Sequence, residues 1–209
     1  MKNRTIKIEK TARYTTIGNK EKAKVLIVAL HGYGQLSTYF SKHFNTLDER
    51  YYIIIPEGLS RFYISGTSGR VGSSWMTKEE RLIDIEDNLN YLNKLYVSEE
   101  CHLFKTKIMI GFSQGASTGF RWLINTPDFF QSFISWGSAI PDDLEFEKMK
   151  NVLPPMRFFV LGNNDPYFPE IQKDNVVMQY NQLDFKIITF NGEHKIDIPI
   201  LKAVLNSIK

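Results

Sequence analysis

Unbroken runs of apolar residues recur along the chain and predict strands that are buried on both faces of a sheet. Six such runs occupy residues 23–30, 51–56, 107–112, 132–137, 157–162 and 185–190. Most of them end in Gly or Pro, residues that close a strand with a loop. Two segments near the N-terminus, 5–9 and 12–18, are rich in β-branched residues and predict two further strands.

Apolar residues spaced three or four positions apart fall between these runs and predict helices. The pattern is clearest in residues 78–97 and 197–208, and it is weaker in 37–47, 114–126 and 169–181. Strands that alternate with helices form a mostly parallel sheet with helices on both faces. The sequence thus predicts one α/β domain over residues 1–209, built on a mostly parallel eight-stranded sheet.

The longest stretch without either pattern is GLSRFYISGTSGRVGSSWMT, residues 57–76. It is too long for a simple connection, and long loops of this kind are often functional. We expect it to form a partial lid over a binding site.

Composition narrows the class of protein. The chain has 209 residues, of which 43% are hydrophobic and 23% are charged, an ordinary balance for a globular protein. The formal net charge of +3 is small, and the lysines are interspersed with acidic residues, as in TKEERLIDIED. Binding to nucleic acid would need a cluster of basic residues, so we expect no nucleic-acid partner.

The N-terminus and the single cysteine bear on the cellular setting. The N-terminal sequence MKNRTIKIEK lacks the apolar core of a signal peptide, and no apolar run is long enough to cross a bilayer. A cytoplasmic protein without stable membrane insertion is therefore expected. Cys101 is the only cysteine, so no internal disulfide forms, and it is expected to be a structural thiol.

The segment KIMIGFSQGASTGF, residues 107–120, carries the strongest chemical signal. Its apolar run ends in G-F-S-Q-G, and a helix is predicted directly afterwards. A direct turn from strand to helix would bring side chains two positions before and after the serine into collision, which Gly111 and Gly115 avoid. Such a turn lifts the hydroxyl of Ser113 out of the backbone at the sheet edge where ligands bind. Ser113 is the candidate nucleophile, and a glycine-rich turn that only packs a helix is the alternative.

A serine nucleophile needs a base, usually a histidine that is held by a carboxylate. Of the four histidines, His194 lies in the loop NGEH after the last predicted strand and is the candidate base. His43 and His102 are expected at the surface.

The acid should lie between Ser113 and His194 in chain order. Asp165 follows the next-to-last strand, in GNNDPYFP, and is the candidate, with an ordinary Asp-Pro turn as the alternative. The rival carboxylates are those of Asp142, Asp143, Asp174 and Glu193.

An acyl-transfer reaction also needs two backbone N–H donors for its oxyanion. One comes from the residue after the nucleophile, Gln114. The other comes from the loop HGYGQ, residues 31–35, whose glycines allow a substrate to approach the backbone closely. Tyr33 is the first choice of donor and Gly34 the second, and His31 is expected to order the loop by hydrogen bonds.

The order of these motifs along the chain resembles that of an α/β-hydrolase. Within that fold, HGYG, GFSQGAS and GNNDPYFP are similar to the phospholipase/carboxylesterase group, which includes the acyl-protein thioesterases. The resemblance spans essentially the whole chain. It implies an α/β-hydrolase fold without a large cap domain, a catalytic triad of Ser113, Asp165 and His194, and oxyanion donors at Tyr33 and Gln114.

The chain departs from the pattern of this group in three loops. Gln35 stands where the group often has Asp, and Ala116 stands where it often has a second glycine. The sequence GSSWMTKEE replaces a Trp-Phe-Asp signature, with Trp75 as the counterpart of the tryptophan. Such loops supply most acyl-binding contacts, so these departures bear on the choice of substrate.

The resemblance implies a serine hydrolase that acts on small-molecule carboxylic esters or thioesters. We expect small to medium acyl chains to bind in a pocket lined by loop aromatics: Phe62, Tyr63, Trp75, Tyr167 and Phe168. The reaction needs no metal or organic cofactor. Some relatives dimerise, which allows a homodimer, although no self-complementary patch is evident. The alternatives are a peptidase or lactonase on the same fold and a binding protein without catalytic activity.

Overall fold

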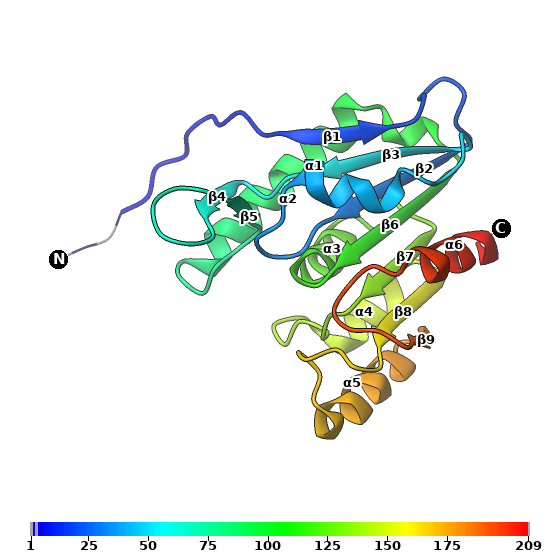
Figure 1. The fold of residues 1–209 in the computed structure, drawn as a ribbon. Helices are drawn as coiled ribbons and strands as arrows, with labels where there is room; N and C mark the ends of the chain where they lie inside the picture. Colours follow the sequence, from blue (N-terminus) through cyan, green and yellow to red (C-terminus); the bar gives the residue numbers. More distant parts are fainter. Residues whose placement is uncertain (1, 3, 209) are drawn as a thin grey trace.

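A seven-stranded sheet forms the centre of the computed structural model, which describes residues 2 and 4–208 (Figure 1). Residues 1, 3 and 209 of the expected domain lie outside the described residues. The strands are β1 (Tyr14–Ile17), β2 (Val25–Leu30), β3 (Tyr51–Pro56), β6 (Thr106–Phe112), β7 (Ser132–Trp136), β8 (Met156–Gly162) and β9 (Lys186–Phe190). They lie in the order β1-β3-β2-β6-β7-β8-β9. Strand β1 is antiparallel to β3, and the other neighbouring pairs of this sheet are parallel, which confirms the mostly parallel sheet.

The prediction of an eighth strand is wrong, because residues 5–9 do not pair with the sheet. Ile6 and Ile8 are 87% and 79% exposed, and the segment runs away from β1 as extended chain (Figure 1). A hairpin with β1 would need a tight turn between residues 9 and 12, but Glu-Lys-Thr-Ala lacks the Gly, Asn or Asp that such turns favour. Residues 5–9 are rich in β-branched side chains, but without a tight turn after them they do not form a strand.

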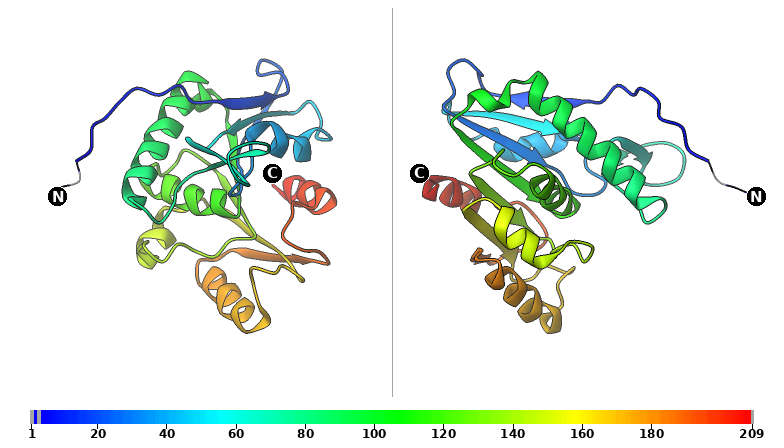
Figure 2. Two further views of the ribbon diagram at one scale, coloured as in Figure 1. Left: turned by 60° about the vertical axis from the view of Figure 1, so that its left-hand side comes forward. Right: turned by 180° about the vertical axis from the view of Figure 1, so that it is seen from behind.

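Helices cover both faces of the sheet (Figure 2). Their bounds are α1 (Ser37–Phe40), η1 (Ser41–Phe44), α2 (Arg81–Ser98), η2 (Cys101–Leu103), α3 (Gln114–Asn125), α4 (Phe146–Val152), α5 (Glu170–Gln182) and α6 (Ile198–Ser207). Helices α2, α3, α4 and α5 contribute to the apolar core on one face, and α1, η1 and α6 contribute to the core on the other. No helix in the described part of the chain combines the length and the apolar character needed to span a membrane.

The long segment 57–76 contains a small antiparallel hairpin that the sequence pattern does not predict. It consists of β4 (Ser60–Tyr63) and β5 (Val71–Ser74), and it projects from the carboxyl side of the sheet (Figure 1). A bridge between Gln35 and Ser73 attaches it to the loop that follows β2. Four-residue strands with few apolar side chains are too short to be recognised from periodicity.

Candidate active site

Ser113 occupies a strained turn between β6 and α3. Its backbone angles are φ +52° and ψ −123°, a conformation that a residue with a side chain rarely adopts. Its N–H donates a hydrogen bond of 2.8 Å to the carbonyl oxygen of Trp136, at the end of the neighbouring strand β7. The turn is thus held by the sheet that it leaves.

The glycines on either side of Ser113 have no room for a side chain. A Cβ at Gly111 would lie 2.3 Å from the Cα of Ala116, and one at Gly115 would lie 2.2 Å from the carbonyl oxygen of Leu30. Both contacts are with backbone, which cannot move aside. The spacing G-x-S-x-G is therefore a steric requirement of this turn.

His194 and Asp165 are joined by a hydrogen bond of 2.7 Å between Nδ1 and Oδ2. Asp165 follows β8 and is 3% exposed, and its other oxygen, Oδ1, accepts a bond of 3.0 Å from the N–H of Tyr167. Because a carboxylate only accepts, the imidazole donates from Nδ1, and its Nε2 is left as an acceptor without a partner among residues 2 and 4–208. In this arrangement His194 can act as a base through Nε2, while Asp165 orients its ring.

The imidazole lies beside the serine turn. Its ring packs on Phe112, the residue before Ser113, at 4.8 Å between ring centroids. It also touches Gly137, which follows the strand that holds the Ser113 N–H, since a Cβ built there would be 3.1 Å from Nδ1. Among the described residues, no hydrogen bond joins Ser113 to His194. In unliganded enzymes such bonds are often long and shorten when substrate binds.

The other histidines lie elsewhere. His43, on η1, packs against Phe40, and His102 is exposed on η2. His31 is fully buried at the end of β2: its Nδ1 donates a bond of 2.8 Å to the Gly32 carbonyl, and its Nε2 accepts one of 3.0 Å from the Gly58 N–H. Burial lowers the pKa of His31 to about 4, so the ring is neutral and its contacts tie two loops together.

The rival carboxylates are not held against the imidazole. Asp143 forms an ion pair of 2.5 Å with Arg121, and Asp142 is exposed, 4.0 Å from Arg81. Asp174 lies on the surface of α5, and Glu193 is exposed one residue before His194. Asp165 is the carboxylate that contacts His194.

The loop of residues 31–35 lies against the serine turn. A Cβ at Gly32 would be 3.3 Å from the Cβ of Ser113. The Gly34 N–H already donates to the Ser73 carbonyl, at 2.9 Å, and the Gly32 N–H donates to Oε1 of Gln35, at 2.8 Å. Within the described residues, the N–H groups of Tyr33 and Gln114 have no acceptor. These two amides are free to bind a substrate oxygen, whereas that of Gly34 is occupied.

The side chain of Gln114 is a part of the site that the sequence analysis missed. Its Oε1 accepts bonds of 3.0 Å from the Trp75 N–H and 3.2 Å from Oγ of Ser74, and its Nε2 donates one of 2.7 Å to the Met76 carbonyl. It therefore fastens the end of the hairpin segment to the first residue of α3. A glutamine in G-x-S-x-G gives no sign of this partner, because residues 74–76 are distant in the sequence.

The five aromatic residues expected to line an acyl pocket do not share one environment. Trp75 and Phe168 are buried, at 1% and 6% exposure, and Trp75 donates from Nε1 to the His31 carbonyl, at 2.8 Å. These two rings are packed in the interior and present little surface to a ligand. Tyr167 is 70% exposed and packs on the His194 ring at 4.6 Å between centroids.

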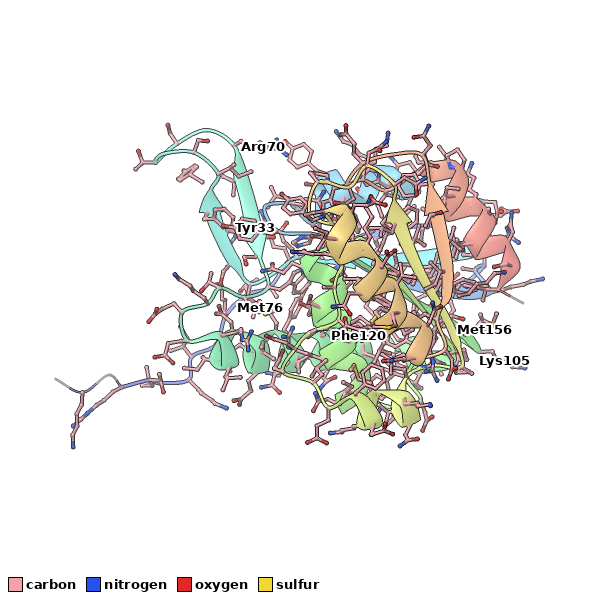
Figure 3. The ribbon with its side chains drawn as sticks, turned by 90° about the horizontal axis from the view of Figure 1, so that it is seen from below. Tyr33, Arg70, Met76, Lys105, Phe120 and Met156 are labelled. Carbon is pink, nitrogen blue, oxygen red and sulfur yellow. The ribbon has the colours of Figure 1, made fainter. Side chains whose placement is uncertain are left out.

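Phe62 and Tyr63 lie on β4, not in an irregular loop. The Phe62 ring packs on that of Tyr33, with 5.0 Å between centroids. Figure 3 shows Tyr33 close to the base of the hairpin. The hairpin therefore touches the loop that carries one of the free amides. Cys101 is buried at the start of η2, and burial raises the pKa of its thiol to about 12.

A mostly parallel sheet with a strained serine between a strand and a helix defines the α/β-hydrolase class. The family model described as "Serine hydrolase (FSH1)" matches residues 19–208, and the chain belongs to this family. No curated protein sequence matches the chain significantly.

Solved structures with the same fold include several esterases. Esterase PE8 has a TM-score of 0.71 and 20% identity, with 95% of this chain and 99% of that chain covered. A carboxylesterase from Mesorhizobium loti has a TM-score of 0.69 and 12% identity, covering 94% and 95%. Acyl-protein thioesterase 2 from Zea mays has a TM-score of 0.67 and 18% identity, covering 93% and 100%.

These comparisons confirm two sequence predictions. The α/β-hydrolase fold is shared with the structural neighbours, which include members of the carboxylesterase and acyl-protein thioesterase groups, and the described elements of this chain include no large cap domain. The family assignment makes the chain a serine hydrolase, as the motif GFSQG indicates.

Proposed function

We propose that this serine hydrolase cleaves carboxylic esters or thioesters of small to medium acyl chains through Ser113, His194 and Asp165. The observation that carries the proposal is the 2.7 Å bond between His194 and the buried Asp165, beside a serine held at φ +52°. A buried carboxylate that orients a histidine next to a serine hydroxyl is the arrangement that activates serine.

In the first half of the reaction, Oγ of Ser113 attacks the substrate carbonyl while Nε2 of His194 takes its proton. Asp165 holds the ring and stabilises its charged form. The carbonyl oxygen becomes an oxyanion, to which the free N–H groups of Tyr33 and Gln114 donate. Each such donor lowers the barrier by about 3 kcal/mol. His194 then gives its proton to the leaving alcohol or thiol, and an acyl-serine remains.

In the second half, water attacks the acyl-serine. His194 takes a proton from the water and returns it to Oγ of Ser113 when the tetrahedral intermediate collapses. The products are a carboxylic acid and the free enzyme. These steps use only side chains and amides of this chain.

The test uses a fluorophosphonate probe, which reacts with activated serines. Labelling should occur in the wild type and in Cys101→Ala, and it should be absent in Ser113→Ala. Hydrolysis of p-nitrophenyl esters of increasing acyl length, with a panel of thioesters, then defines the substrate range. In a closed pocket, one methylene changes the activation free energy by about 1–3 kcal/mol. A folded wild-type protein that is not labelled would favour a binding protein, and cleavage of amides or lactones in place of these esters would favour a peptidase or lactonase.

A further inference from the structure

An open groove of about 510 Å³ lies between the β4–β5 hairpin and residues 13 and 36 of the main domain. Its lining residues are Arg13, Leu36, Arg61, Phe62, Tyr63 and Val71. Tyr63 lies directly opposite Val71 in the hairpin, and Arg61 is two residues from Tyr63. Since side chains alternate along a strand, these three belong to the same face. The groove therefore has apolar walls and a cationic end.

The groove lies next to the loop of residues 31–35, through Leu36 and Phe62 of its lining. Leu36, on its wall, is three residues beyond Tyr33, whose amide is one of the two proposed oxyanion donors. The Phe62 ring, which packs on Tyr33, joins the groove to the same loop. A substrate whose carbonyl lies at Ser113 could extend past this loop into the groove.

Positive charge is in excess at the cationic end. A shallow depression continues from the groove, and its lining includes Lys10, Arg13, Arg61 and one carboxylate, that of Glu57. Glu57 is buried and forms an ion pair with Arg13. The Nε and Nη2 of Arg13 both donate to Oε1 of Glu57, at 2.9 and 2.5 Å. Arg61 has no ion pair within the part of the chain that the structure describes, and it lines both the groove and the depression.

We propose that this groove binds the far end of the ester substrate and that Arg61 selects substrates that carry a carboxylate or similar oxyanion at that end. This inference rests on the proposed function and adds the substrate class. An apolar chain that ends in an anion would fit this site, because the chain contacts the apolar walls and the anion pairs with the guanidinium of Arg61. A neutral chain of the same length would make the apolar contacts and lose the charged one.

The kinetic test compares two matched substrates, the mono-4-nitrophenyl ester of suberic acid and its methyl-capped neutral counterpart. In the wild type we expect kcat/KM to be about tenfold higher for the anionic ester, the effect of one charge-assisted hydrogen bond. The ratio should fall towards one in Arg61→Gln, invert in Arg61→Glu, and shrink as salt screens the exposed charge. Arg70→Gln, near the hairpin tip and outside the groove lining, should leave the ratio unchanged (Figure 3).

A binding measurement separates this inference from the proposed function. In Ser113→Ala, calorimetry should find tighter binding of monomethyl suberate than of dimethyl suberate, and Arg61→Gln in that background should remove the difference. Equal binding of the two esters, or a preference that survives Arg61→Gln, would overturn the inference even if the enzyme hydrolyses neutral esters. A preference removed by Arg61→Gln would support the groove even if the fluorophosphonate test failed.

Discussion

Asp165 accepts a single short hydrogen bond from His194, with 2.7 Å between Oδ2 and Nδ1. Asp165→Asn keeps the shape of the side chain but removes its charge and favours the wrong tautomer of the imidazole. We expect kcat for a p-nitrophenyl ester to fall by about 10⁴-fold, with little change in KM. Steady-state kinetics and thermal unfolding, measured on the same preparation, check this.

The matched control is Asp174→Asn, which makes the same chemical change on the surface of α5. It should retain wild-type kinetics. If Asp165→Asn stayed within tenfold of the wild type while folded, another carboxylate would have to serve as the acid, and the assignment would be wrong.

Gly137 leaves just enough space for the imidazole. It has φ +57°, and a Cβ added there would lie 3.1 Å from both Cε1 and Nδ1 of His194. We expect Gly137→Ala to displace the ring and to lower kcat by on the order of 10²-fold, the usual effect of misplacing a catalytic group by about 1 Å. The kinetics of p-nitrophenyl ester hydrolysis provide the measurement.

Gly66→Ala is the control that distinguishes displacement of the His194 ring from the effect of backbone strain. Gly66 has a similar φ, +61°, but no atom of the described residues lies within 4 Å of an added Cβ. This variant should lose about 1 kcal/mol of stability and retain its activity. Equal losses of activity in both alanine variants would show that strain, not contact with His194, is responsible.

The sequence predicts most of the fold because buried parallel strands produce long apolar runs. All six long runs correspond to strands of the sheet, and the periodic segments 78–97 and 197–208 correspond to α2 and α6. Segment 37–47 is divided between the short helices α1 and η1. Helix α4 and the β4–β5 hairpin were not predicted, since neither is long enough to establish a period.

Prediction of the site had a similar limit. Ser113 stands in a local motif whose steric cause is local, so its position could be reasoned from sequence alone. The contact between Asp165 and His194 is long-range, but both residues follow strands that end at the same edge, which made their pairing an expectation. The bonds of Gln114 to residues 74–76 could not be anticipated, because they depend on how the hairpin segment returns to the sheet.

Gln114 should matter beyond its backbone amide. Gln114→Leu would leave the Trp75 N–H and the Met76 carbonyl without their present partner. We expect the free energy of unfolding to fall by about 2 kcal/mol, and the rate of fluorophosphonate labelling to fall with it, because the Gln114 amide, the proposed oxyanion donor, moves. Urea denaturation and labelling time courses measure the two effects.

Gln131→Leu is the control for a general loss of stability. Oε1 of Gln131 accepts a bond of 2.9 Å from the Lys107 N–H, at the opposite end of β6 from Ser113. This variant should also be less stable but should be labelled at the wild-type rate under native conditions. If Gln114→Leu were labelled as fast as Gln131→Leu, the glutamine side chain would have only a structural role.

His31 should make the stability of the protein depend on pH. Burial lowers the pKa of its imidazole from 6.5 to about 4. Below pH 6.5 the unfolded chain therefore binds a proton at His31, whereas the folded protein binds it only near pH 4. Between these values the unfolded state binds more protons, and the free energy of unfolding therefore falls as the pH falls. Above pH 6.5 both states are neutral and the contribution is constant. The full effect of this shift is about 3 kcal/mol.

Urea denaturation of the wild type and of His31→Gln, between pH 7.5 and 4.5, measures this contribution. The variant should be less stable at pH 7.5, because the bonds to the Gly32 carbonyl and the Gly58 N–H are altered. Its stability should then decline less steeply than that of the wild type, so the two curves converge as the pH falls. The other titrating groups are shared by both proteins and cancel in the comparison. Parallel curves over this range would show that His31 takes up its proton equally in the folded and unfolded states, contrary to its buried position.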